Sequence, residues 1–124
     1  MMTKPKVSIM MNCYNSEKHL KEAIDSIYNQ TFSDWEIIFW DNQSTDKSAA
    51  IAQSYDKRLK YFLAPEFTNL GKARQLSLQN VKGEYLCFLD CDDKWLPEKL
   101  QTQLGIMEKD KEIALCYSQM FTYF

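Results

Sequence analysis

Three aspartates lie within four positions, immediately after the apolar run YLCFL at residues 85–89. Asp90 and Asp92 are two positions apart, so in an extended or turning segment both carboxylates can point to one side. Two such carboxylates offer oxygen ligands to Mg²⁺ or Mn²⁺, cations that also bind substrate phosphates. The alternative is a polar loop whose acids cap the next helix, and Asp93 is the candidate for that cap.

A second polar cluster, DNQSTD at residues 41–46, follows the apolar run WEIIFW. Asp41 can accept hydrogen bonds from the base or ribose of a nucleoside. Equally, Asp, Asn and Ser form turns and helix caps, so Ser44 or Thr45 can simply begin a helix here. Asp46 is expected to act only as a partner of that helix's dipole.

Two weaker patterns complete the set, NCYN at residues 12–15 and NLGKAR at residues 69–74. Tyr14 can stack on a base or donate its hydroxyl, or it can be a partly buried loop aromatic. Gly71 permits close approach of backbone to a phosphate, and Arg74 complements the charge. The spacing is neither that of a P-loop nor that of a dinucleotide-binding fingerprint.

The remaining reactive residue types are expected to be structural. His19, the only histidine, is predicted to be a surface residue in the first turn of a helix. The four cysteines form neither a C-x-x-C pair nor a zinc cluster, and are predicted to be buried, reduced thiols. They are Cys13, Cys87, Cys91 and Cys116.

Short apolar runs alternate with amphipathic segments along the chain. The runs predict strands at residues 7–11, 35–40, 59–63, 85–89 and 113–117. The amphipathic segments predict helices at residues 17–29, capped by Ser16, and at 46–55, 72–80 and 97–109. This alternation is typical of one α/β domain, spanning residues 1–124, with a mostly parallel sheet.

In such a sheet, ligands bind where the strands end, so the polar clusters after the first, second and fourth strands should meet at one edge. The net charge of −2 argues against a nucleic-acid-binding face, which would be basic. No apolar run reaches the roughly 18 residues of a membrane helix, and the N-terminus lacks a signal-peptide cleavage site.

The chain ends in the apolar sequence QMFTYF, residues 119–124. We expect this chain to be the N-terminal part of a longer protein, and such an exposed end to favour a homodimer.

Two long segments resemble the family 2 glycosyltransferases of the GT-A fold. VSIMMNCYNSEKHLKEAIDSIYNQTFSDWEIIFWDNQSTDKS is similar to the family's opening block, with its Tyr-Asn turn and its acidic loop after the second strand. LGKARQLSLQNVKGEYLCFLDCDDKWLPEKL is similar to the second block, which ends in Asp-x-Asp-Asp and a Pro-initiated helix. The resemblance covers nearly the whole chain and implies a Rossmann-like GT-A sheet with flanking helices, truncated after about the fifth strand.

The resemblance implies transfer of a sugar from a nucleotide-diphosphate sugar to an acceptor hydroxyl, with inversion and with Mn²⁺ or Mg²⁺ as cofactor. A saccharide or lipid-linked acceptor, surface polysaccharide synthesis, and a cytoplasmic location at the inner membrane face are the corresponding family-level expectations. No nucleic-acid partner is expected.

The resemblance also implies roles for individual residues. Asn12 and Tyr14 would border the nucleobase, and Asp41 and Asn42 would lie in the nucleoside pocket. Arg74 would lie near the base or phosphates, and Asp90 near the sugar or ribose. Asp92, with Asp90, would hold the metal, and Asp93 would support their loop. These residues are Asn12, Tyr14, Asp41, Asn42, Arg74, Asp90, Asp92 and Asp93.

Two departures from the family pattern matter. Asn42 stands where the family usually has a second acid, so the base preference is expected to shift away from uracil. The family's general base lies on a later segment, so we expect it beyond Phe124 and expect the chain alone to be inactive.

Two rival functions remain open at this level. A nucleotidyltransferase would want a glycine-rich, basic phosphate loop after the first strand, where this chain has NCYNS. A non-catalytic flavodoxin-like regulatory domain would have an acidic pocket but would not need Tyr14 or Arg74.

Overall fold

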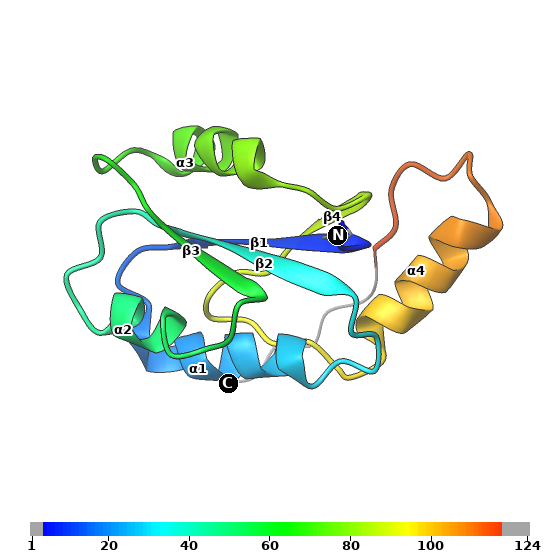
Figure 1. Cartoon of the computed structure of the whole chain (residues 1–124), viewed down its shortest axis with the longest axis horizontal. Helices are drawn as coiled ribbons and strands as arrows, with labels where there is room; N and C mark the ends of the chain where they lie inside the picture. The colour runs from blue at the N-terminus through cyan, green and yellow to red at the C-terminus, as the bar shows by residue number, and fades with distance from the viewer. Residues whose placement is uncertain (1–3, 118–124) are drawn as a thin grey trace.

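Among the residues that the computed structural model describes, 4–117, four parallel strands form one sheet in the order β3-β2-β1-β4 (Figure 1). The strands are β1 (Val7–Cys13), β2 (Trp35–Asp41), β3 (Leu59–Leu63) and β4 (Tyr85–Phe88). The pairings of β1 with β2, β1 with β4 and β2 with β3 are all parallel. The predicted α/β fold with a parallel sheet is therefore confirmed.

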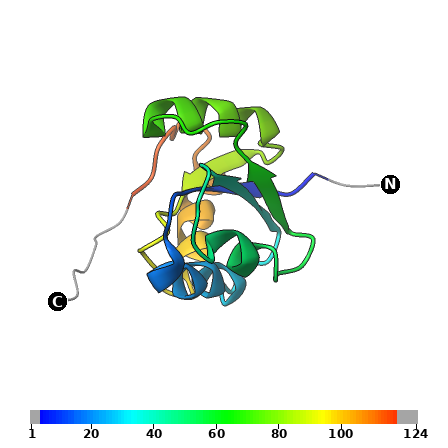
Figure 2. The same ribbon diagram turned by 90° about the vertical axis from the view of Figure 1, so that its left-hand side faces the viewer.

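Helices cover both faces of this sheet (Figures 1 and 2). On one face lie α1 (Glu17–Tyr28) and α2 (Ser48–Ala52), and on the other lies α3 (Leu70–Ser77), which continues into the short 3-10 helix η1 (Leu78–Asn80). The last helix, α4 (Lys99–Lys109), packs through Leu100 into the core on the α1 side. Within residues 4–117, no helix is long and apolar enough to cross a bilayer.

The two central strands are almost fully buried, as strands covered on both faces must be. The larger core lies between the sheet and α1, where Leu20, Ile24 and Ile27 pack against alternate residues of β1 and β2. A smaller core under α3 contains Trp40, Ala64 and Ala73. The apolar residues of α1 recur at helical spacing, so they form one stripe that faces this core.

A buried carboxylate holds the amino-terminal edge of the sheet together. Glu36 is 2% exposed and accepts hydrogen bonds from Lys60 Nζ at 2.6 Å, from the Lys82 backbone N–H at 2.9 Å, and from the Ser8 hydroxyl. Burial opposes ionisation of Glu36, but the bonds from Lys60, Ser8 and Lys82 outweigh it and lower its pKa below the ordinary value. The Gly83 N–H donates to the same Ser8 hydroxyl at 2.7 Å.

The predicted fifth strand at residues 113–117 is wrong. This segment is irregular, and Leu115 and Tyr117 are 79% and 86% exposed. Its side chains favour a strand, but within residues 4–117 no neighbouring strand pairs with its backbone. The described sheet therefore ends after the fourth strand, and the expected sticky end at residues 119–124 lies outside the described residues.

The start of α1 depends on a contact with another loop and not on its own N-cap side chain. Ser16 stands at the N-cap of α1, but its hydroxyl donates to the Tyr14 carbonyl, and the Glu17 N–H is capped instead by Asp46 at 3.1 Å. Neither Ser44 nor Thr45 caps α2, which begins after Lys47 and is shorter than predicted.

The start of the last helix was also predicted too early. α4 begins at Lys99, with Glu98 at its N-cap position. Asp93 lies too far upstream to cap it, so the capping alternative for Asp93 is wrong.

Candidate functional site

Three loops meet where β1, β2 and β4 end, as the sequence predicts. The Asn42 N–H donates to the Cys13 carbonyl at 2.8 Å, and the Thr45 N–H donates to Asn15 Oδ1 at 2.7 Å. The Cys91 thiol donates to the Asn12 carbonyl at 3.4 Å. Residues far apart in the sequence are thus fixed along one edge of the sheet.

The segment between β3 and α3 joins the same edge. The Asn42 amide donates to the Thr68 carbonyl at 2.7 Å and accepts from the Thr68 N–H at 3.1 Å. The side chain of Asn12 donates to the Ser77 hydroxyl at 3.4 Å, and Asn69 caps α3. Asn12 and Asn42, both predicted site residues, therefore hold neighbouring loops together.

The three aspartates form one exposed cluster after β4. Asp90, Asp92 and Asp93 each place a carboxylate oxygen within 4.8 Å of the others. Burial, followed by the charges of Asp92 and Asp90, raises the pKa of Asp93. Carboxylates this close repel one another, and a divalent cation is the partner that both neutralises them and suits their oxygens. The donor set therefore fits Mg²⁺ or Mn²⁺.

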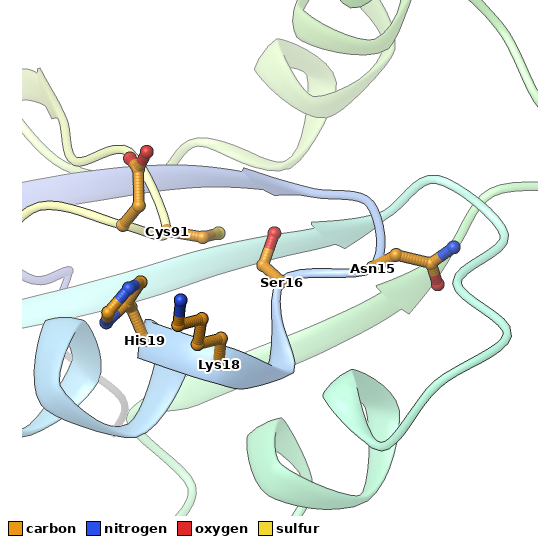
Figure 3. A pocket seen from close by; sticks show the side chains of 6 residues that line it. Asn15, Ser16, Lys18, His19 and Cys91 are labelled. Atoms are coloured by element: carbon orange, nitrogen blue, oxygen red, sulfur yellow. The ribbon is translucent and has the colours of Figure 1, made fainter.

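A pocket of about 320 Å³ lies beside this cluster. Its lining residues come from the start of α1 and from the aspartate loop: Asn15, Ser16, Lys18, His19, Cys91 and Asp92. Figure 3 shows the side chains of Lys18 and His19 on the first turn of α1, on the side of the loop that carries Cys91. His19 is exposed, as predicted, but its place in this pocket was not predicted.

Asp41 is the last residue of β2 and is buried, with 1% of its surface exposed. Its carboxylate accepts hydrogen bonds from the Ser44 N–H at 2.9 Å and from the Tyr61 hydroxyl at 2.5 Å. Burial and this bond raise the pKa of Tyr61. Both Asp41 oxygens thus have protein partners, and Tyr61 is a site-shaping residue that the sequence analysis missed.

Two exposed aromatic rings stand at the rim. Tyr14 is 50% exposed and Phe67 60% exposed, and their centroids lie 5.0 Å apart with an interplanar angle of 66°. Arg74 is also exposed, with its guanidinium 5.7 Å from the centroid of the Phe88 ring. Tyr14 and Arg74 were predicted as site residues, whereas Phe67 was not.

The cysteines are free thiols, as predicted, but only Cys13 and Cys91 are buried, while Cys87 and Cys116 are half-buried. Cys13 and Cys91 interact directly. The side-chain hydrogen bond with Cys91 lowers the pKa of Cys13 to about 6, and the same bond, together with burial, raises the pKa of Cys91.

Comparison with known sequences places these features in one family. Residues 8–123 match the family described as Glycosyl transferase family 2. The uncharacterized glycosyltransferase MJ1057 of Methanocaldococcus jannaschii is 38% identical over 97% of this chain and 43% of its own length. The UDP-Glc:alpha-D-GlcNAc-diphosphoundecaprenol beta-1,3-glucosyltransferase WfgD of Escherichia coli is 32% identical over 84% of this chain and 42% of its own length. The chain thus spans less than half the length of these relatives.

Solved structures share the arrangement of the sheet and helices. Residues 1–349 of S. aureus TarS, in complex with UDP-GlcNAc, match with a TM-score of 0.80 and 29% identity, over 84% of this chain and 31% of that chain. The mannosyltransferase PcManGT of Pyrobaculum calidifontis, in complex with GDP-Man and Mn²⁺, matches with a TM-score of 0.76 and 21% identity, over 85% of this chain and 33% of that chain.

Proposed function

The chain belongs to glycosyltransferase family 2 and has the GT-A fold, and from this premise we propose that it binds a nucleotide-diphosphate sugar for transfer to an acceptor hydroxyl. The observation that carries the proposal is the meeting of an acidic cluster and an exposed aromatic pair at one edge of the sheet. Neither a nucleotidyltransferase nor a flavodoxin-like regulatory domain is retained, because the family match covers residues 8–123.

In this proposal Asp92, together with Asp90, holds Mn²⁺ or Mg²⁺. When bound there, the cation would supply positive charge that stabilises a diphosphate leaving group. Asp93 supports the loop, since its N–H donates to the Asp90 carbonyl at 3.1 Å. Asp90 is also assigned to the sugar or ribose, since its side chain is exposed and a ligand can contact it.

The nucleoside end of the donor is assigned to the aromatic rim. Tyr14 and Phe67 present ring surface on which a base can stack. Asp41 and Asn42 contribute to this nucleoside site mainly by positioning its loops. Their side chains are already bonded to Ser44, Tyr61 and Thr68. Arg74 supplies positive charge toward the base or phosphates.

Catalysis of sugar transfer and the choice of acceptor depend on the whole protein. Inverting transfer needs a general base to deprotonate the acceptor, and we assign this base to a residue beyond Phe124. The 124-residue chain is then expected to bind the donor without transferring the sugar. A saccharide or lipid-linked acceptor fits the name of WfgD, whose acceptor is a diphosphoundecaprenol-linked sugar. Surface polysaccharide synthesis at the cytoplasmic membrane face, and a homodimer through the C-terminal end, complete the proposal.

Calorimetric titration with UDP, GDP and dTDP, each with and without Mn²⁺, tests this function. We expect one nucleotide to bind in a Mn²⁺-dependent manner, and Asp92→Asn to weaken that binding at least about tenfold, the scale of lost metal support. Asp34→Asn is the matched control, because Asp34 is exposed at the opposite end of the sheet. If a folded sample binds none of the three nucleotides, or binds them equally well after Asp92→Asn, the proposal is wrong.

A further inference from the structure

Cys13 and Cys91 occupy neighbouring positions on two adjacent chain segments. The parallel register of β1 and β4 runs from the pair Val7 and Tyr85 to the pair Met10 and Phe88. Extended by three positions, this register places Cys13 opposite Cys91. The segments do stay together beyond β4, since the Leu89 N–H donates to the Met10 carbonyl at 3.1 Å and the Cys91 thiol reaches the Asn12 carbonyl at 3.4 Å.

Both thiols also face the same side of the sheet. Alternate residues of each segment point into the core that packs on α1, and these are Val7, Ile9, Met11 and Cys13 on one segment, and Tyr85, Cys87, Leu89 and Cys91 on the other. Neighbouring strands are about 4.8 Å apart, which lies within the range of about 4.4 to 6.8 Å between the Cα atoms of a disulfide. Adjacent positions on one face therefore suit a bridge.

A small oxidant can reach the pair from solvent. Cys13 is 1% exposed and Cys91 is 5% exposed, but Cys91 lines the pocket of about 320 Å³ beside Asp92. Figure 3 shows its sulfur on the loop opposite Ser16 and Lys18. A molecule the size of water or hydrogen peroxide can enter this pocket.

We propose that Cys13 and Cys91 form a reversible disulfide when the protein meets a peroxide. The Cys13 sulfur attacks one peroxide oxygen, the O–O bond breaks, and Cys13 becomes a sulfenic acid with release of one water. The Cys91 sulfur then attacks the Cys13 sulfur, the S–O bond breaks, and a second water leaves. Two thiols are oxidised to one disulfide, and one hydrogen peroxide is reduced to two waters.

This bridge would act on the acidic loop, a step that rests on the proposed function. Cys91 lies between Asp90 and Asp92, so a covalent bond to β1 fixes the loop in a shifted position. The two Cβ atoms of a disulfide lie about 3.8 Å apart, closer than side chains on neighbouring strands, so the loop must move toward β1. Because metal sites need ligands held within about 0.5 Å, the bridge should weaken Mn²⁺-dependent nucleotide binding.

Intact-mass measurement and peptide mapping of the 124-residue chain, before and after hydrogen peroxide, test the bridge itself. We expect the loss of two hydrogen atoms, a linked peptide pair containing Cys13 and Cys91, and reversal by dithiothreitol. Cys13→Ser and Cys91→Ser should each abolish this product, whereas Cys87→Ser should leave it unchanged. Oxidation of Cys116 without the Cys13–Cys91 link, or a link through Cys87, would overturn the proposal.

Calorimetry on the same samples tests the consequence. The bridged protein should bind its nucleotide with Mn²⁺ about tenfold more weakly than the reduced protein, as for other changes in metal support, and dithiothreitol should restore the affinity. A bridge that leaves the affinity unchanged would overturn its effect on the loop. Failure of the reduced protein to bind any nucleotide would instead contradict the proposed function, while the mass measurement still decides the disulfide.

Discussion

Tyr14 and Phe67 leave large aromatic surfaces in water at the rim of the site, 50% and 60% exposed. Stacking of a base on an aromatic ring contributes about 1 to 3 kcal/mol, so we expect Tyr14→Ala and Phe67→Ala each to weaken nucleotide binding by roughly tenfold. Calorimetric titration in the presence of Mn²⁺ measures the change. Tyr117→Ala, which removes an aromatic ring that is 86% exposed, should have no effect. If both variants bound the nucleotide with unchanged affinity, the base would not stack on Tyr14 or Phe67.

Glu36 makes stability depend on pH in a predictable direction. Its pKa is lower in the folded than in the unfolded chain, where it is near its ordinary value of 4.5. Its contribution to stability is therefore fully present above about pH 4.5 and is lost as the pH falls through the folded pKa. We expect Glu36→Gln to lower the free energy of unfolding by about 1 to 3 kcal/mol near pH 7, and by less as the acid becomes protonated.

Urea unfolding of the two proteins at about pH 7 and about pH 3 measures this difference. Glu22→Gln, in which an exposed acid of α1 is replaced, is the control and should show little change at either pH. A Glu36→Gln deficit that is as large in acid as at neutral pH would mean that shape, not charge, is what Glu36 supplies.

At the scale of elements, the turn into β4 is fixed by one close backbone approach. A Cβ atom at Gly83 would lie 2.6 Å from the Ser8 backbone nitrogen and 2.9 Å from the Val7 carbonyl carbon, and neither can move without shifting β1. We expect Gly83→Ala to destabilise the fold by about 1 to 3 kcal/mol, the usual cost of overpacking. Denaturant unfolding measures it.

Gly105→Ala is the matched control for this substitution. Gly105 lies within α4 and an added Cβ would meet nothing within 4 Å, so alanine there should be neutral or stabilising by about 0.5 to 1 kcal/mol. If both variants were equally stable, the contact of Gly83 with β1 would not be a constraint on the fold.

The sequence predicted well the elements whose secondary structure is decided by the pattern of their own side chains. The central strands β1 and β2 and the helix α1 carry apolar patterns that match their burial, whereas Leu86 and Phe88 of the outer strand β4 are exposed. The acids after β4 lie at the carboxyl end of the sheet because they follow that strand directly. Residues 113–117 have equally good strand propensity, yet no strand pairs with them in the described part of the chain. Strand pairing is a tertiary property, which a local pattern does not contain.

The same limit applied to the site. The places of Asp90, Asp92 and Tyr14 at the carboxyl end of the sheet were predictable, because their segments are recognisable locally. Phe67 meets Tyr14, and Tyr61 meets Asp41, only after β3 and its following loop have folded beside β2. Nothing in the residues around Phe67 distinguishes it from an ordinary loop aromatic.

Over the whole molecule, the two ends of the sheet differ in what they do for stability. At the amino-terminal end, the Glu36 network pairs a buried charge and closes the turn at Gly83. At the carboxyl end, exposed acids repel one another and two aromatic rings face water. Unfavourable charge repulsion and exposed apolar surface are typical of a binding site. A bound ligand relieves both, because it neutralises the acids and covers the rings.

The whole chain should therefore gain stability from its ligands. A ligand that binds only the folded state at 100 times its Kd adds about 2.7 kcal/mol, which for a chain of 124 residues corresponds to a rise in Tm of roughly 10 °C. We expect this rise with Mn²⁺ and the preferred nucleotide together, measured by thermal unfolding. Removing Mn²⁺ with EDTA should abolish it.

In this measurement, Asp92→Asn distinguishes stabilisation by the bound ligand from stabilisation by the loss of a repelling charge. The variant should lose the ligand-induced rise, yet unfold without ligand at the same or a higher temperature than the original chain, because one of the mutually repelling charges is gone. A lower Tm of ligand-free Asp92→Asn would mean that the Asp92 carboxylate stabilises the loop itself. An equal rise with nucleotide in EDTA would mean that binding does not need the cation.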